Sequence, residues 1–180
     1  MEQTRRRIAE AAMQLHGTVG PAYTSMSAVA ERAGVTRMTL YRHFPTEQEL
    51  FGACSSLWRD LHPRPSPERW TALTPRQRVG QALADLYPYY QANAAMLTNL
   101  LRDAHAVPKA LREGMAAAPE QMADVLVDAW PPARHTAELK ATLTHVCRFE
   151  TWRSLNQAGL DPTLSASTAV EWVMAVASRK

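Results

Sequence analysis

A short run of basic and hydroxyl side chains lies between Thr36 and His43. Arginine suits guanine edges and phosphates, threonine can reach a base edge or a methyl group, and tyrosine and histidine suit phosphate oxygens. Leu40 and Phe44 are one helical turn apart, so both can face a core while the polar residues lie on other faces. The candidate nucleic-acid contacts in this run are Thr36, Arg37, Thr39, Tyr41, Arg42 and His43.

The residues around this run have the spacing of two short helices joined by a tight turn. Apolar residues recur at helical spacing between positions 26 and 33, and Gly34 ends that pattern. Thr36 can cap a second helix, which must end before Pro45 because the residue preceding a proline is disfavoured in helical geometry. This arrangement is typical of a helix-turn-helix, whose second helix enters the major groove of DNA.

Two further groups of residues are candidates for phosphate contacts. Arg5 and Arg6 lie at the start of a predicted helix, where positive charge opposes the helix dipole, and a phosphate partner would explain them. The alternative is a solvated, frayed terminus. Ser25 and Ser27 lie near the start of the helix over 26–33, where they can satisfy its first amides, bind phosphate, or do both.

The stretch from residue 24 to residue 50 resembles the signature of the tetracycline-repressor (TetR) family, including its Leu40-Tyr41-x-His43-Phe44 element. The resemblance implies a DNA-binding helix-turn-helix domain over 1–46 and a helical ligand-binding and dimerisation domain over 47–180. It also implies a homodimer formed through the last two helices. Such a dimer presents two recognition helices about one DNA turn apart, so the operator is expected to be a rough palindrome.

The sequence departs from this family pattern at two positions. Met38 stands where a small glycine or alanine is usual, and Glu47 stands where a lysine is usual. The phosphate contact that the lysine would make is therefore missing. Because a carboxylate near a helix N-terminus favours folding, Glu47 can exchange DNA affinity for stability.

The pattern of the whole chain predicts an all-α fold of about nine helices, because strand signals are nearly absent. We expect a first helix over 4–17 capped by Thr4, a helix that begins after Thr46, and a single helix over 134–158. Proline residues break the chain between positions 62 and 67. Pro88 is expected to kink its helix, and Pro119 to kink or split its own.

Aromatic, methionine and histidine side chains are plentiful after residue 55 and favour a largely apolar or aromatic small-molecule effector. Each of them can equally be ordinary core, since large side chains fill interiors first. The candidate ligand-binding residues are Trp58, Tyr87, Tyr90, Met96, His105, Met115, Met122, His145, Phe149 and Trp152.

Two other classes of function have weaker support in the sequence. An enzyme is disfavoured because no His-Glu-x-x-His motif, phosphate-binding glycine loop or serine elbow is present. We therefore expect no catalytic residue, metal site or cofactor, and we expect Cys54 and Cys147 to be buried thiols. A protein-interaction module without DNA binding is the remaining alternative, and only Glu47 argues for it.

Composition is consistent with these expectations. The net charge of +3 permits a polyanionic partner without requiring one. No segment approaches the roughly 18 apolar residues of a membrane span, and the residues after the N-terminal arginines are not the apolar core of an export signal. The sequence therefore predicts a cytoplasmic protein with no membrane partner.

Overall fold

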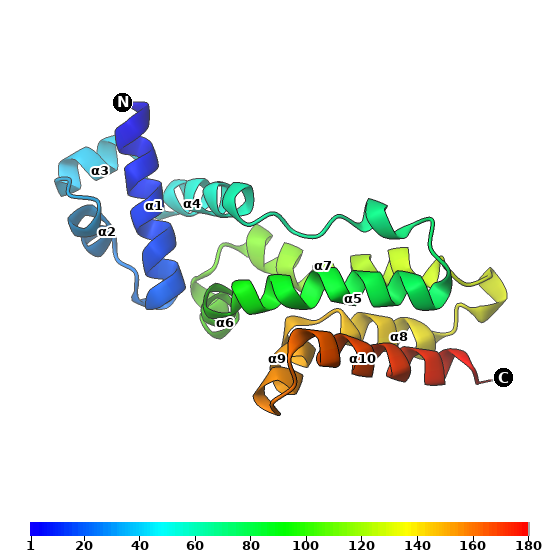
Figure 1. The fold of residues 1–180 in the computed structure, drawn as a ribbon. Helices are drawn as coiled ribbons and strands as arrows, with labels where there is room; N and C mark the ends of the chain where they lie inside the picture. The colour runs from blue at the N-terminus through cyan, green and yellow to red at the C-terminus, as the bar shows by residue number, and fades with distance from the viewer. Residues whose placement is uncertain (180) are drawn as a thin grey trace. The chain divides into compact units, whose positions relative to one another are not determined.

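The computed structural model describes residues 1–179, which form ten α-helices, four short 3-10 turns and no strand (Figure 1). The predicted all-α fold is confirmed, with one helix more than expected. The α-helices are α1 Glu2–Thr18, α2 Met26–Arg32, α3 Arg37–His43, α4 Glu47–Leu61, α5 Pro75–Ala92, α6 Ala94–Arg102, α7 Lys109–Val127, α8 Ala137–Val146, α9 Phe149–Gln157 and α10 Pro162–Ala177. The 3-10 turns are η1 Pro21–Tyr23, η2 Pro67–Trp70, η3 Ala104–Ala106 and η4 Pro132–Arg134.

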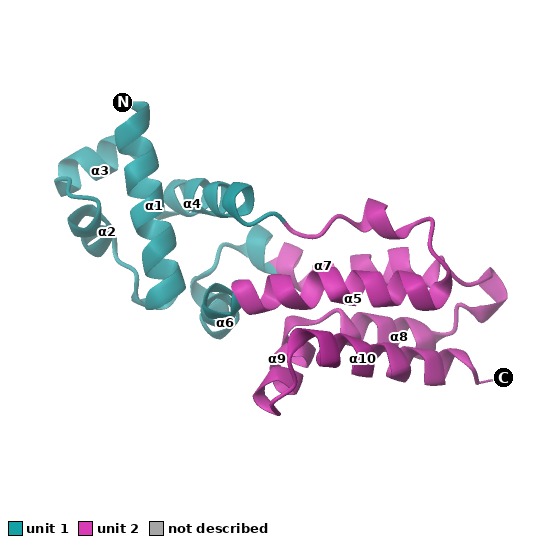
Figure 2. Ribbon diagram, viewed as in Figure 1, with its two compact units in different colours: residues 1–63, 93–112 teal, residues 64–92, 113–180 magenta. Residues whose placement is uncertain are grey.

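The chain forms two compact units, each built from two separate stretches of sequence (Figure 2). Unit 1 comprises residues 1–63 and 93–112, and unit 2 comprises residues 64–92 and 113–180. The first border between them lies within the predicted proline-rich break. The helix α4 therefore belongs with the three N-terminal helices in unit 1. The functional boundary at residues 46 and 47 stays a prediction.

The core of unit 1 explains why its N-terminal helices form where they do. Ile8 and Ala12 from α1 and Leu40 from α3 are fully buried, and α1 packs against both α2 and α4. The side chains of Ser25, Thr36 and Thr46 cap α2, α3 and α4. The predicted cap at Thr4 is wrong, because α1 already begins at Glu2 and no side chain caps it.

The end of α1 is held by an amide from far along the chain. The side-chain nitrogen of Asn99, in α6, donates to the carbonyls of His16 and Gly17 at 3.0 and 3.1 Å. The last four carbonyls of a helix lack partners within it, so this amide satisfies groups that burial would otherwise leave unpaired. Asn99 is itself buried. The helix α6 is therefore part of the unit that contains the helix-turn-helix.

An ion pair at the C-terminal end of α6 forms hydrogen bonds with the segment that follows α1. Arg102 pairs with Asp103 at 2.7 Å and donates to the carbonyl of Val19 at 2.8 Å. The carboxylate of Asp103 accepts the backbone N–H of Ala22 at 3.2 Å. Gly20 lies between them at a φ of 99°, and a Cβ there would collide with both charged groups. No other residue type fits this position without strain.

Unit 2 contradicts the expectation of one helix over 134–158. The chain forms α8 and α9 instead, with Arg148 in extended conformation between them. The hydroxyl of Tyr87 donates to the carbonyl of Val146 at 2.9 Å, and that of Tyr90 donates to the carbonyl of Cys147 at 2.5 Å. Burial raises the pKa of both hydroxyls, so they stay protonated and keep donating. These bonds stabilise the break.

The remaining proline and cysteine expectations can be compared directly with the structure. The helices α5 and α7 continue through Pro88 and Pro119, so α7 is not split. Cys54 and Cys147 are buried free thiols, as predicted, and burial raises the pKa of each to about 12. Within residues 1–179, no helix is long and apolar enough to cross a membrane. The same residues contain no cluster of three or more potential metal ligands.

Candidate nucleic-acid interface

The helix α3 is anchored on one side and open on the other. Leu40 and Phe44 are fully buried, as their spacing predicts. Met38 and Tyr41 remain 83% and 41% exposed. Arg37 and Arg42 are also exposed, whereas Thr39 and His43 are half-buried. The structure thus gathers the predicted run of basic and polar side chains on the outer side of one short helix.

The hydroxyl groups at the starts of α2 and α3 are engaged in capping. Ser25 accepts the backbone N–H of Ala28 at 3.2 Å, and Thr36 accepts that of Thr39 at 3.1 Å. The hydroxyl of Thr36 also donates to that of Thr39 at 3.0 Å. Of the two uses proposed for Ser25, amide capping is therefore present. Ser27 is exposed on the first turn of α2.

The N-terminal arginines have different surroundings. Arg5 is half-buried, its guanidinium lies 4.1 Å from the centre of the Phe44 ring, and it donates to the carbonyl of His43. Arg6 is exposed and pairs with Glu10 at 2.9 Å. Both were candidate phosphate contacts, but the guanidinium of Arg5 already has two contacts inside the chain, one hydrogen bond and one aromatic ring.

The two positions that depart from the family pattern are both on the surface. Met38 projects from α3 into solvent, so the larger side chain does not disturb the core. Glu47 is exposed in the first turn of α4, where Thr46 caps the N–H of Glu49 at 3.1 Å. A carboxylate at this helix end is electrostatically favourable.

Comparison with known proteins identifies this three-helix arrangement. Residues 8–54 match the family model described as bacterial regulatory proteins, tetR family. A stretch of 57 residues is 37% identical to the HTH-type transcriptional regulator AcrR of Shigella flexneri. It covers 32% of this chain and 25% of AcrR, so the match spans only about a quarter of that relative.

Solved structures share the fold over nearly the whole chain. A TetR-like transcriptional regulator from Rhodococcus sp. RHA1 gives a TM-score of 0.68 at 17% identity, covering 98% of this chain and 97% of that one. NalD, the secondary repressor of the MexAB-OprM multidrug efflux pump in Pseudomonas aeruginosa, gives 0.60 at 21% identity, covering 97% and 96%. Residues 8–54 therefore resemble the N-terminal domain of TetR-family regulators. At these identities the structures support the fold alone.

The tyrosines predicted to bind ligand have structural contacts inside unit 2. Tyr87 and Tyr90 are buried, and their hydroxyls hold the break between α8 and α9. Tyr90 packs edge-on against Phe149, with ring centres 5.5 Å apart, and Trp152 lies 5.4 Å from Phe149. The buried indole N–H of Trp152 has no hydrogen-bond partner within the described part of the chain. These residues form an aromatic cluster whose role in ligand binding stays a prediction.

The other predicted ligand residues are dispersed over both units. In unit 1, Trp58 stacks on His62 at 3.8 Å and Met96 is buried. His105 lines a cavity of about 630 Å³ formed by η1, η3 and the first turns of α2 and α4. In unit 2, Met115 and Met122 are half-buried and His145 is exposed.

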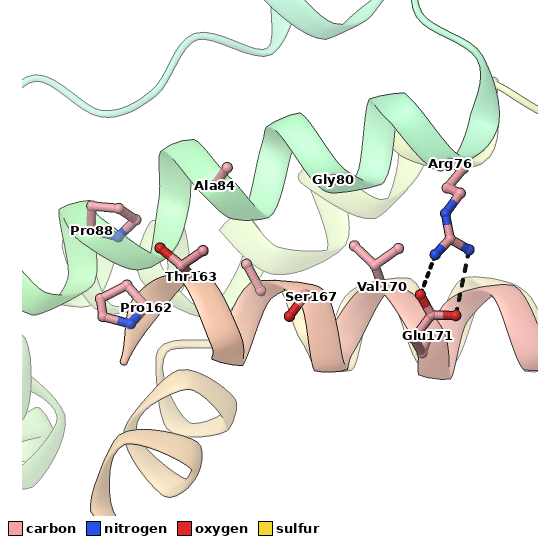
Figure 3. Close-up of a pocket in the computed structure, with 10 residues that line it drawn as sticks. Arg76, Gly80, Ala84, Pro88, Pro162, Thr163, Ser167, Val170 and Glu171 are labelled. Carbon is pink, nitrogen blue, oxygen red and sulfur yellow. Dashed lines mark hydrogen bonds and ion pairs between the residues drawn. The ribbon is translucent and has the colours of Figure 1, made fainter. Parts of the chain in front are cut away.

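A second hollow of about 320 Å³ runs between α5 and α10 in unit 2 (Figure 3). Its lining includes small residues, among them Gly80, Ala84 and Ser167, and the Arg76–Glu171 ion pair lies at one end. None of the predicted ligand residues lines it.

Sequence reasoning missed the residues whose partners lie far along the chain. The main example is Asn99, because its residue type and its position in a helix give no local sign of its contacts.

Proposed function

We propose that this chain is a transcriptional repressor of the TetR family that binds duplex DNA by placing α3 in the major groove. The proposal rests on the exposure of basic and polar side chains along the outer side of α3. On the opposite side, the buried Leu40 and Phe44 anchor the helix in the core of unit 1. The helix-turn-helix uses its second helix in this way. The likeness to AcrR, which is named a transcriptional regulator, supports the same function.

The exposed residues divide into two kinds of contact. Arg37 and Arg42 have planar groups that suit guanine edges or phosphates, and the flexible side chain of Met38 suits the methyl group of thymine. Tyr41 and Ser27 are placed for phosphate oxygens beside the groove. The base contacts give sequence preference, while the phosphate contacts set the position of the helix.

We further propose a homodimer through α10. Val146 and Trp152 are buried within the chain itself, so they cannot contribute to a dimer surface. Leu164 and Trp172 are 53% and 41% exposed, and they lie eight positions apart on α10, about two helical turns. Exposed large apolar groups on one helix face favour self-association. A two-fold dimer requires a roughly palindromic operator.

The effector that releases the repressor is proposed to be small and largely aromatic or apolar. The aromatic cluster of Tyr90, Phe149 and Trp152 supports this proposal. The unpartnered indole N–H of Trp152 further suggests a ligand that carries an acceptor oxygen, because a buried donor normally has a partner. Coupling between ligand and DNA is typically about 1–3 kcal/mol.

Fluorescence anisotropy with the duplex upstream of the chain's own gene tests the DNA proposal. Arg42→Ala and Tyr41→Phe should both weaken binding, and loss of a base contact by Arg42 should reduce affinity by about 1–3 kcal/mol. Arg148→Ala, which removes an exposed arginine from unit 2, is the matched control and should leave affinity unchanged. Unchanged affinity in both α3 variants would refute the assignment of α3 as the recognition helix.

A further inference from the structure

The C-terminal end of α3 lacks the common ways of satisfying its last carbonyls. Many helices end in a glycine of positive φ, whose geometry lets following amides bond back to the helix. Here Phe44 follows α3 with φ −138° and ψ 86°, and the next residue, Pro45, has no N–H to donate. The N–H of Phe44 bonds the carbonyl of Leu40 at 2.8 Å. The carbonyl of His43 therefore needs a donor from elsewhere.

Arg5 of α1 supplies that donor. Its guanidinium donates to the carbonyl of His43 and lies over the Phe44 ring, 4.1 Å from the ring centre. A guanidinium can do both at once, because it is planar, carries five N–H donors and stacks on aromatic faces. The two contacts join the last turn of α3 to the first turns of α1.

The position of Arg5 on α1 explains why it differs from its neighbours. Arg5 precedes the buried residues Ile8 and Ala12 by three and seven positions, so it continues the stripe of α1 that faces the core of unit 1. Arg6 and Arg7 lie on other sides of α1 and are exposed. Consecutive arginines that read alike in the sequence therefore have different roles.

We infer that Arg5 is a positioning residue of the nucleic-acid interface: it fixes the end of α3 against α1 and makes no phosphate contact of its own. The orientation of α3 determines where Arg37 and Arg42 point, so Arg5 acts on recognition through them. The inference rests on the proposed function for its effect on DNA, but its structural part can be measured without DNA.

The DNA-free test is amide hydrogen exchange in the full chain. In Arg5→Met, the Phe44 amide should exchange roughly tenfold faster than in the wild type, because a charged hydrogen bond and a cation–π contact are lost. The Ala33 amide, which ends α2 by bonding Val29, should be unchanged. Arg7→Met removes an exposed neighbour and is the matched control. Unchanged exchange at Phe44 in Arg5→Met would overturn the inference.

The DNA test separates positioning from phosphate contact by salt dependence. A residue that neutralises a phosphate lowers the slope of log affinity against log salt by about one when it is removed, and it weakens all sequences alike. Arg5→Met should instead keep the wild-type slope and its affinity for unrelated duplex, while affinity for the operator falls severalfold. Arg5→Lys should recover only part of that loss, since an ammonium cannot stack as a planar group.

A slope lowered by about one, with equal weakening on both duplexes, would make Arg5 a phosphate contact and overturn the inference. If the wild-type chain binds no duplex, the proposed function fails instead. The exchange at Phe44 would still decide whether Arg5 holds α3.

Discussion

The buried His16 ring is expected to lower the stability of unit 1 in acid. It is only 7% exposed, packs against the Phe51 ring at a tilt of 30° with ring centres 4.7 Å apart, and has its Nδ1 3.6 Å from the sulfur of Cys54. Burial lowers its pKa from 6.5 to about 4, because the imidazolium form would lose its hydration without gaining an anionic partner. In the folded chain the ring is therefore neutral at any pH well above 4.

This lowered pKa predicts a loss of stability in mild acid. The unfolded chain takes up a proton at His16 near pH 6.5 and the folded chain only near pH 4, so the free energy of unfolding should fall as the pH drops between those values. The full effect of this pKa difference is about 3–4 kcal/mol, and most of it falls between pH 7 and pH 4.5. Urea unfolding at pH 7 and pH 4.5 measures it. His16→Phe should lose most of the pH dependence, and His145→Gln, at an exposed position, should keep it.

Individual residues also show which structural roles could be predicted from the sequence. The caps at Ser25 and Thr36 and the burial of Leu40 and Phe44 could be predicted, because each depends on residues within one or two turns. The role of Arg5 could not, since its partner lies 38 positions away in the sequence. A basic residue on an apolar helical stripe was the one signal available for it.

Among the elements, the same limit appears in the split between α8 and α9. The stretch from Val146 to Phe149 contains neither glycine nor proline, so its local pattern is compatible with a continuous helix. The break depends on the hydroxyls of Tyr87 and Tyr90, which are 59 and 57 positions from the carbonyls they bind. Tertiary contacts override local propensity there. Whether Tyr87 and Tyr90 also contact a ligand stays a prediction.

The hydrogen bonds from α6 to the end of α1 lead to a second prediction. Asn99→Ala should destabilise unit 1 by about 1–3 kcal/mol. The variant removes the side-chain amide that donates to the carbonyls of His16 and Gly17, and it leaves these two carbonyls without that donor. Urea unfolding followed through unit 1 amides measures the change. Asn156→Ala, an exposed asparagine of α9, provides the comparison. Equal stability of the two variants would show that water replaces the Asn99 amide without loss.

For the whole molecule, the proposed dimer makes the most direct prediction. Trp172→Glu places a charge on the exposed apolar side of α10 and should convert a dimer into a monomer of 20.0 kDa at micromolar concentrations. Sedimentation equilibrium determines the mass. Ser178→Glu adds the same charge at an exposed position after α10 and should stay dimeric. A wild-type monomer, or a Trp172→Glu dimer, would exclude association through this face.

The shared construction of unit 1 has a consequence for protein engineering. A chimera that transplants only residues 1–63 onto a different sensor domain would leave behind Asn99 and the Arg102–Asp103 pair. Gly20 would then keep its positive φ without the Arg102 and Asp103 side chains that pack against it. The proposed DNA-binding part of this chain is therefore not expected to function when residues 1–63 are transferred alone. A workable graft has to carry residues 93–112 with it, or supply an equivalent helix from the recipient.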